Sequence, residues 1–229
     1  MAFLELKNLS KEYLRGRAGF KAVNGVNLSI GEGDYINIIG RSGSGKTTLL
    51  NLMSGMVSPS EGEVLIDGES LFAKDDEGLS RIRNGKIGYI PQGISTLPNL
   101  NVIDNIVLPF FLNKREGDVY GRARKLLALL NIRDLEYGYP NELSGGELRR
   151  VLIARSLINQ PKVLMADEAT ADLDVHNTKE VMELFKRINE EEGVALVLVS
   201  HELDLLSYGK AIYTMDGGVL REGNLLTGQ

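Results

Sequence analysis

Apolar residues recur along the chain in two patterns, one with the two-residue period of half-buried strands and one with the longer period of helices. The two-residue period covers residues 3–8 and 26–30 and predicts a strand in each. Residues 35–39 form a continuous apolar run that predicts a buried strand. A glycine-rich turn follows this run and leads into residues 46–55, which have the pattern of a helix. Residues 63–66 predict one more strand, so the first part of the chain is rich in strands.

The rest of the chain continues this alternation around a long helical stretch. The predicted elements are a short strand at residues 86–90, a mainly helical stretch at 102–160 that breaks at 138–140, strands at 163–166 and 194–199, a helix at 175–192, and a hairpin formed by 211–215 and 219–222. Strand–helix alternation at both ends predicts a largely parallel sheet, with the middle stretch inserted as a helical subdomain. The whole chain is then one domain, with a core of residues 1–92 and 161–229 and a helical subdomain of residues 93–160.

Composition and charge limit the expected binding partners and the cellular compartment, and they say less about the fold. The 229 residues are 43% hydrophobic and 25% charged, an ordinary balance for a soluble globular domain. The formal net charge of −5 argues against nucleic acid as the main partner, because phosphate backbones attract an excess of Lys and Arg. The absence of cysteine excludes disulfides and thiolate metal sites and fits the cytosol. No apolar run approaches the roughly 20 residues that span a bilayer, so we expect no direct membrane insertion.

The glycine-rich turn after residues 35–39 has the sequence of a phosphate-binding loop. It consists of Gly40, Arg41, Ser42, Gly43, Ser44, Gly45, Lys46 and Thr47, and Thr48 comes next. Gly43 and Gly45 allow a bend in which backbone N–H groups converge on phosphate oxygens, and the following helix adds its positive end. Lys46 is placed to reach the β- and γ-phosphates, and the Thr47 hydroxyl to ligate magnesium. A chance match is the alternative, but the strand before the turn and the helix after it favour a nucleoside triphosphate site.

Two adjacent carboxylates, Asp167 and Glu168, follow the predicted strand at residues 163–166. They lie at its C-terminal edge, which is where ligands bind in open parallel sheets. Asp167 would hold magnesium directly or through water, and Glu168 would orient and deprotonate the attacking water as a general base. Such a pair can instead begin a helix with favourable dipole placement, but its occurrence beside a phosphate-binding loop favours the catalytic interpretation.

A second anion-binding sequence lies within the long helical stretch. Ser144, Gly145 and Gly146 precede Glu147 and a helical run at residues 148–158. Backbone N–H groups at the start of a helix bind anions. The same residues also have the pattern of a capping box, in which Ser144 caps the helix and Glu147 completes the box three residues later. The two interpretations are compatible.

Leu143 to Glu147, together with the run at residues 149–157, resembles the signature segment of ABC ATPases. It lies between the two nucleotide motifs, as that family requires, and the resemblance covers essentially the whole chain. The resemblance implies the fold of an α/β P-loop NTPase of the RecA-like kind with a mainly parallel sheet. An N-terminal antiparallel β subdomain and an inserted helical subdomain complete the fold that it implies.

The resemblance also implies roles for four residues whose types alone would not reveal them. Gln92 matches the family's glutamine that meets magnesium or the attacking water and reports to the permease. Asp174, in the loop formed by residues 171–174, matches the segment after the acidic pair that contacts the partner subunit. His201 matches the switch histidine that contacts the γ-phosphate, and Tyr13 the aromatic ring that stacks on adenine.

Family membership would further imply how the protein works. It is expected to bind ATP and Mg²⁺, to hydrolyse ATP, and to be a cytoplasmic subunit that lies peripherally on the inner face of the cell membrane. Two copies would dimerise head to tail in an ATP-dependent way, each ATP lying between the phosphate-binding loop of one copy and the signature segment of the other. The sequence is consistent with this, because it has two anion sites but one set of magnesium residues. Hydrolysis would separate the dimer and energise a separately encoded integral membrane permease.

Residues 87–92, 97–102 and 105–109 resemble the lipoprotein-releasing and macrolide-exporting branch, a region that the related cell-division ATPase shares. Two interpretations therefore stay open, a transporter cassette and a mechanical or regulatory ATPase that drives a membrane complex without moving solute. A soluble ABC ATPase of translation or DNA repair is disfavoured, because such proteins usually carry two cassettes or long coiled-coil insertions. Glu147 replaces the commoner glutamine of the signature, and Ala169 stands where many relatives have proline. Neither change removes a reacting group, so we expect an active ATPase.

Overall fold

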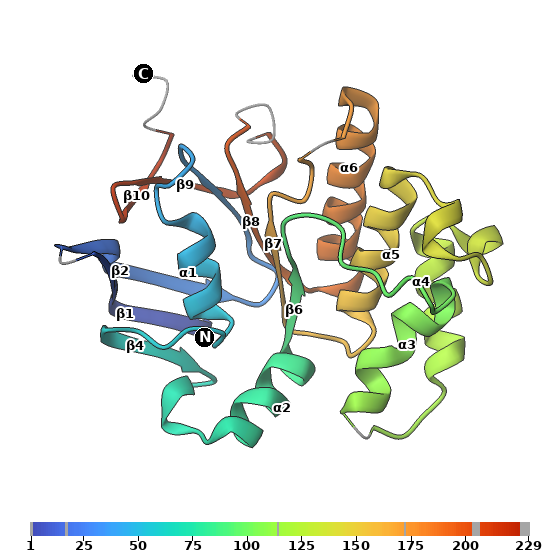
Figure 1. Ribbon diagram of the computed structural model, residues 1–229, viewed down its shortest axis with the longest axis horizontal. Coiled ribbons are helices and arrows are strands. Elements are labelled where there is room, and N and C mark those ends of the chain that lie inside the picture. The colour runs from blue at the N-terminus through green and yellow to red at the C-terminus, as the bar shows by residue number, and fades with distance from the viewer. Residues whose placement is uncertain (1, 17, 114, 172, 203–206, 225–229) are drawn as a thin grey trace.

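A computed structural model describes residues 2–16, 18–113, 115–171, 173–202 and 207–224 of the chain (Figure 1). The strands form a four-stranded and a six-stranded sheet, and most of the helices gather on the side of the larger sheet that faces away from the smaller one. Within the described residues, no helix combines the length and the apolar character that crossing a membrane requires.

The six-stranded sheet has the strand order β10–β9–β3–β8–β7–β6. Its strands are β3 (Tyr35–Ile39), β6 (Ile87–Ile90), β7 (Val163–Asp167), β8 (Ala195–Ser200), β9 (Ala211–Asp216) and β10 (Val219–Glu222). All neighbours pair in parallel except β10, which forms an antiparallel hairpin with β9. The structure thus confirms the mainly parallel sheet and the C-terminal hairpin that the sequence predicts. Parallel pairing brings the C-terminal ends of β3, β6, β7 and β8 to one edge.

The smaller sheet is antiparallel, with the order β2–β1–β4–β5. Its strands are β1 (Ala2–Arg15), β2 (Ala18–Gly31), β4 (Glu61–Ile66) and β5 (Glu69–Ser70). The first two are longer than predicted, because they continue past the core as a hairpin in which Tyr13 pairs with Phe20. Side chains are exposed on both arms there, so no alternation of buried and exposed positions marks the strand in the sequence.

Helix α1 (Lys46–Met53) packs in one hydrophobic cluster with strands of both sheets. Leu49, Leu50, Leu52 and Met53 are all fully buried. A short helix that is enclosed in this way has little freedom to shift, because core side chains are close-packed. The turn between β3 and α1 is therefore held at a fixed place on the edge of the larger sheet.

Four helices cover the other face of the larger sheet, namely α3 (Val102–Leu112), α4 (Val119–Leu129), α5 (Gly145–Leu157) and α6 (Val175–Glu192). Successive residues of the central strands point to opposite faces. Leu164 and Leu196 accordingly join the cluster with these helices, whereas Met165 and Val197 join the cluster with α1. Short 3₁₀ segments at Leu71–Ala73, Arg133–Leu135 and Pro140–Glu142 complete the helical elements. The last of them begins within the break that the sequence predicts at residues 138–140.

Helix α2 (Asp76–Lys86) is an element that the sequence analysis missed. It has no buried residue, so it shows no apolar stripe, and its start is marked instead by the Asp75 side chain, which accepts a hydrogen bond from the Gly78 N–H. Because α2 extends through Lys86, the strand expected at residues 86–90 begins one residue later, at Ile87.

Candidate active site

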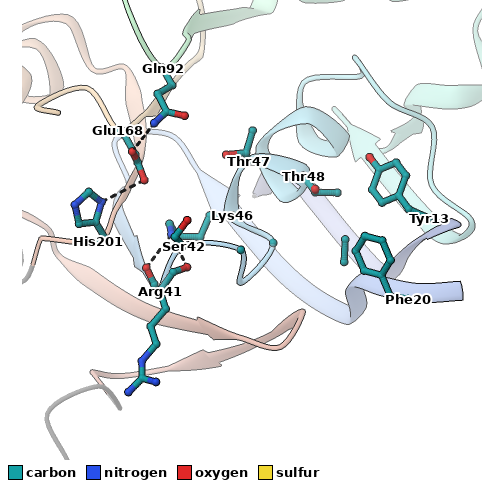
Figure 2. A pocket seen from close by; sticks show the side chains of 14 residues that line it. Tyr13, Phe20, Arg41, Ser42, Lys46, Thr47, Thr48, Gln92, Glu168 and His201 are labelled. Carbon is teal, nitrogen blue, oxygen red and sulfur yellow. Dashed lines mark hydrogen bonds and ion pairs between the residues drawn. The ribbon is translucent and has the colours of Figure 1, made fainter. Parts of the chain in front are cut away.

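A cavity of about 650 Å³ opens at the C-terminal edge of the larger sheet (Figure 2). Most of the residues that the sequence analysis assigns to the nucleotide line it, namely Tyr13, Gly40, Ser42, Gly43, Gly45, Lys46, Thr47, Thr48, Gln92, Glu168 and His201. Phe20, Ala22 and Arg41 complete the lining. Ser44 and Asp167 do not line this cavity; they are buried, with 6% and 2% of their surface exposed.

The phosphate-binding loop is packed so closely that two of its glycines have no room for a side chain. A Cβ on Gly45 would lie 2.0 Å from the Ala22 carbonyl oxygen, and Gly45 also has a left-handed φ of 108°. A Cβ on Gly40 would lie 2.4 Å from the Met215 carbonyl oxygen. Only glycine permits this approach, and the result is a loop whose backbone lines the cavity directly.

The Lys46 ammonium is held by the loop itself. Its Nζ donates to the carbonyl oxygens of Gly40 at 2.8 Å and Arg41 at 3.1 Å. Burial lowers the pKa of Lys46, an effect that the nearby carboxylates of Glu168 and Asp167 oppose. The Lys46 ammonium is therefore held at the cavity by neutral carbonyl oxygens. Phosphate oxygens carry negative charge and accept stronger hydrogen bonds from an ammonium group than carbonyl oxygens do.

Asp167, the last residue of β7, has the features of a magnesium ligand. Its carboxylate hydrogen-bonds the Thr47 side chain, yet its Oδ1 is buried and has no hydrogen-bond partner among the described residues. Burial raises the pKa of Asp167, and the Glu168 charge adds to that effect, so the ionised carboxylate is disfavoured unless a nearby cation offsets the cost. The described residues hold no cluster of three acidic, His or Cys side chains, so a metal here would complete its shell with phosphate and water oxygens.

Glu168 is joined to both of the other predicted catalytic residues (Figure 2). Gln92, which follows β6, donates from Nε2 to Glu168 Oε2 at 2.8 Å. His201, which follows β8, places Nδ1 3.2 Å from Glu168 Oε1. Glu168 has a left-handed φ of 49°, a conformation that is uncommon for this residue type and is held by a hydrogen bond from its N–H to Val199. Three segments far apart in the sequence thus meet at one carboxylate.

Two aromatic rings stand at the opposite end of the cavity from Glu168 (Figure 2). The centroids of Tyr13 and Phe20 are 6.0 Å apart and the rings are tilted by 34°. Tyr13 is 36% exposed and Phe20 49% exposed, so neither ring is buried in the core. Phe20 is not among the residues predicted from the sequence, because the exposed β1–β2 hairpin leaves no periodic signal; its pairing with Tyr13 becomes visible only in the structure.

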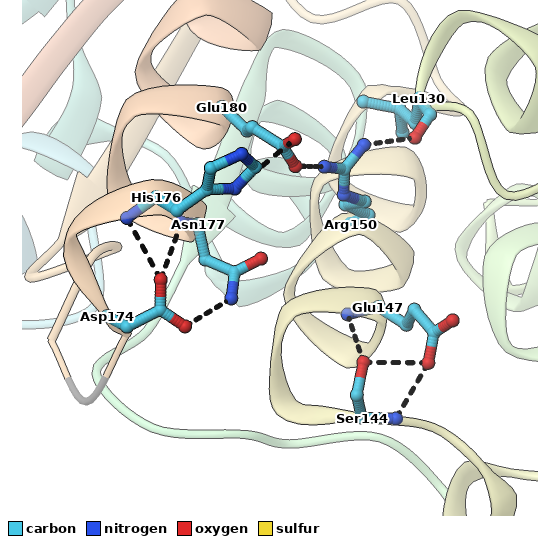
Figure 3. Close-up of polar contacts among 8 residues, drawn as sticks. All are labelled: Leu130, Ser144, Glu147, Arg150, Asp174, His176, Asn177 and Glu180. Carbon is cyan, nitrogen blue, oxygen red and sulfur yellow. Dashed lines mark hydrogen bonds and ion pairs between the residues drawn. The ribbon is translucent and has the colours of Figure 1, made fainter.

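The predicted signature residues are not among the residues that line this cavity, and Figure 3 shows two of them, Ser144 and Glu147, at the start of α5. Ser144 caps α5 in the predicted capping box: Glu147 Oε2 accepts from the Ser144 N–H and from its Oγ, each at 2.7 Å. These hydrogen bonds hold the pKa of Glu147 below its usual range. Ser144, Gly146 and Glu147 line a separate hollow of about 610 Å³, and Gly145 begins α5 beside it.

Asp174 lies in neither hollow. It caps α6, where its Oδ1 accepts from the N–H groups of His176 and Asn177 at 2.9 Å each (Figure 3). Asp172, in the same predicted partner-contacting loop, lies outside the described residues. One chain therefore does not bring its signature segment or Asp174 to its own phosphate-binding loop.

Comparisons with known proteins agree with this geometry. The family described as ABC transporter matches residues 23–171. An uncharacterized ABC transporter ATP-binding protein of Methanocaldococcus jannaschii, MJ0796, is 40% identical over 97% of both chains. The lipoprotein-releasing system ATP-binding protein LolD of Bdellovibrio bacteriovorus is 38% identical over 92% of this chain and 96% of its own. Solved dimeric structures of MJ0796, one with ADP and phosphate bound, superpose with a TM-score of 0.88 at 36% identity over 97% of this chain and 98% of theirs.

Proposed function

Because this chain belongs to the ABC transporter family of ATP-binding cassettes, we propose that it hydrolyses ATP and energises a membrane permease through an ATP-driven, head-to-tail dimer. The observation that carries the proposal is the separation within one chain of two complementary half-sites. The phosphate-binding loop, Asp167 and Glu168 lie at one cavity or beside it, and the start of α5 lies at another hollow. The first half-site has the phosphate-binding and hydrolytic residues, and the second has the anion-binding helix start that would contact the γ-phosphate from the other side.

In this proposal the nucleotide lies along the first cavity. The rings of Tyr13 and Phe20 face the adenine end, and stacking of a base on an aromatic ring contributes about 1–3 kcal/mol. The backbone of the phosphate-binding loop surrounds the phosphates, and Lys46 exchanges its two carbonyl partners for phosphate oxygens. Thr47, Asp167 and Gln92 would hold Mg²⁺, which when bound neutralises charge on the phosphates. The solved MJ0796 structure with ADP and phosphate supports a hydrolytic nucleotide site of this kind.

Hydrolysis then depends on Glu168. Its carboxylate accepts a proton from a water molecule as the water oxygen attacks the γ-phosphorus and the bond to the leaving ADP oxygen breaks. His201 and Gln92 orient the carboxylate and the water, a role supported by their contacts with Glu168 on both sides. Ala169 is buried, 7% exposed, directly after Glu168, so the turn is held by packing in the absence of a proline.

The partner copy would complete the site by placing the start of its α5 against the γ-phosphate. A capped helix N-terminus suits this contact, because its free N–H groups and dipole attract anions. Dimeric solved structures of a cassette 36% identical to this chain support the assembly. We propose that the helical subdomain of residues 93–160 carries this signature and moves as a unit when the dimer closes.

A permease is the partner that best fits the rest of the surface. The macrolide export protein MacB of Chlorobaculum tepidum combines ATP-binding and permease functions by name; this chain is 35% identical to it over 95% of its own length but covers 33% of MacB. A groove of about 370 Å³ lies beside the Gln92 loop and is edged by Met56 and Leu112, which are 51% and 70% exposed. Large apolar side chains at such a groove suit a segment of a membrane subunit. The chain would then be cytoplasmic and peripheral to the membrane.

Phosphate release tests the proposed function. The purified chain is assayed with ATP and Mg²⁺ alone and after reconstitution in liposomes with its cognate permease. We expect hydrolysis that depends on Mg²⁺ and increases with the permease. Absence of hydrolysis in both preparations would contradict the proposal. Transport of solute by the liposomes would favour a transporter cassette, and stimulated hydrolysis without transport a mechanical ATPase.

A further inference from the structure

The loop that carries Gln92 is fastened to the signature helix by an arginine. Arg155 of α5 donates from Nη1 to the carbonyl oxygen of Ser95 and from Nη2 to Ser95 Oγ, each at 2.9 Å. Both bonds end on one residue, so the planar guanidinium fixes the orientation of Ser95 as well as its position. Ser95 lies three residues after Gln92 in the segment between β6 and α3.

A second arginine of the same helix holds the loop on either side of Gln92. Arg149 is buried, with 3% of its surface exposed, and its Nη1 lies 3.4 Å from the Pro91 carbonyl oxygen and 3.5 Å from that of Gly93. The two arginines of α5 thus contact three loop residues, Pro91, Gly93 and Ser95. The first two are the direct neighbours of Gln92. Gln92 itself is left to contact Glu168.

We propose that Arg155 and Arg149 are positioning residues that set the place of Gln92 relative to Glu168 and make the Gln92 loop move with the signature helix. The inference rests on the proposed function, because it concerns how the hydrolytic carboxylate is engaged. Its physical basis is that one rigid helix joins the two places: Ser144 caps the start of α5, where the partner's nucleotide would bind, and the same helix holds the Gln92 loop beside Glu168. A displacement of the helix start is therefore transmitted to the loop.

Arg155 also faces the groove that we propose for the permease. It lines this groove together with Met56, Tyr89 and Leu112. A segment seated there would contact the same guanidinium that holds Ser95. The Arg155 side chain would therefore contact a docked permease segment, hold the loop that carries Gln92, and move with α5.

A kinetic double-mutant cycle tests the inference. We expect Arg155→Ala to lower kcat by about 10- to 100-fold, the range for displaced catalytic groups, with the KM for ATP changed by less than about twofold. In a Gln92→Ala background the same substitution should cause no further loss, because it acts through Gln92. Ser95→Ala, which removes one acceptor and leaves the fold intact, should give a smaller loss in the same direction.

Arg122→Ala is the matched control. Arg122 donates to the carbonyl oxygens of Leu157 and Ile158 at the end of α5 but does not touch the Gln92 loop. It should lower thermal stability as Arg155→Ala does and leave kcat within about twofold. A loss of kcat for Arg155→Ala that multiplies with that of Gln92→Ala, or an equal loss for Arg122→Ala, overturns the inference.

A measurement without hydrolysis separates this inference from the proposed function. The chain has no tryptophan, so Ile94→Trp, at a loop position that is 50% exposed, places a single tryptophan, excited selectively over the tyrosines, two residues after Gln92. We expect acrylamide quenching of this tryptophan to increase when Arg155→Ala is added and to stay unchanged with Arg122→Ala. Unchanged quenching with Arg155→Ala shows that the arginine does not hold the loop and overturns the inference even if the protein is an active ATPase.

Discussion

Gln92 and Glu168, 76 positions apart in the sequence, are joined by a hydrogen bond of 2.8 Å from the glutamine amide to the carboxylate. The other carboxylate oxygen lies 3.2 Å from His201 Nδ1, so both oxygens of the proposed general base have a polar neighbour. Each carboxylate oxygen has two lone pairs, so Glu168 can keep its contact with Gln92 and still accept a hydrogen bond from water. In the proposed function these two contacts would orient the carboxylate, so a displacement of the Gln92 loop should alter the rate of hydrolysis.

Lys46→Ala should weaken ATP binding by about 1.5–3 kcal/mol, because the phosphates lose a charge-assisted hydrogen-bond donor. Lys125→Ala, on the exposed surface of α4, is the matched control for loss of one positive charge and should leave affinity unchanged. Isothermal titration calorimetry with ATP measures both. Equal affinities for the Lys46→Ala protein and the unchanged protein would refute the phosphate-binding assignment.

The aromatic end of the cavity should contribute to nucleotide affinity through the base alone. Tyr13→Ala is expected to weaken ATP binding by about 1–3 kcal/mol, with a smaller loss for Phe20→Ala. Neither change should affect inorganic triphosphate, which has no base to stack. If ATP and triphosphate lose affinity equally, the rings serve only as packing for the β1–β2 hairpin.

Glu147 should oppose dimer closure, because its carboxylate stays ionised at neutral pH and lies at the proposed contact with the partner's phosphate. Glu147→Gln, made in a Glu168→Gln background, should tighten the ATP-bound dimer by about 1 kcal/mol, or roughly fivefold, the scale of one Coulomb interaction at about 4 Å in water. Sedimentation equilibrium at two salt concentrations measures this, and the gain should shrink at higher salt. A weaker dimer would show that the capping contacts of Glu147 matter more than its charge.

Asp167→Asn should stabilise the protein in the absence of nucleotide and magnesium. Burial raises the pKa of Asp167 above its ordinary value of 3.8, so the folded protein binds this proton more tightly than the unfolded chain does. Stability linked to Asp167 therefore falls as pH rises from the unfolded to the folded pKa, and it stays lost at neutral pH. Thermal melts at pH 7 should show a higher Tm for the variant, together with loss of the magnesium dependence of ATP binding. A lower Tm would mean that attraction to Lys46 outweighs desolvation.

Local patterns in the sequence predict the central elements well. The apolar run at residues 35–39, the glycine-rich turn and the carboxylates at the end of β7 are each defined by neighbouring residues, and the structure places them at one sheet edge. Helix α2 and the outer parts of β1 and β2 escape prediction because their side chains are exposed and leave no periodic signal. Phe20 is missed for the same reason.

Contacts between distant segments cannot be read from periodicity. The bond from Gln92 to Glu168 depends on the parallel pairing of β6 with β7, and the grip of Arg155 on Ser95 depends on how α5 packs. Resemblance to a family suggests Gln92 and His201 as site residues but does not indicate the contacts that hold them. The roles of these residues stay predictions until they are tested by substitution.

The most direct test of ATP-driven dimer closure is the mass in solution of the Glu168→Gln protein. This substitution should slow turnover by about 10²–10⁴-fold, the usual contribution of a general base, while ATP binding stays intact. Size-exclusion chromatography with light scattering, with the cognate permease present in membranes as a parallel arm, reads the assembly. We expect a dimer with ATP and Mg²⁺, a monomer without nucleotide, and a monomer throughout when Ser144→Arg is added. A Glu168→Gln protein that stays monomeric in both arms, or that hydrolyses ATP at the normal rate, would contradict the proposed function.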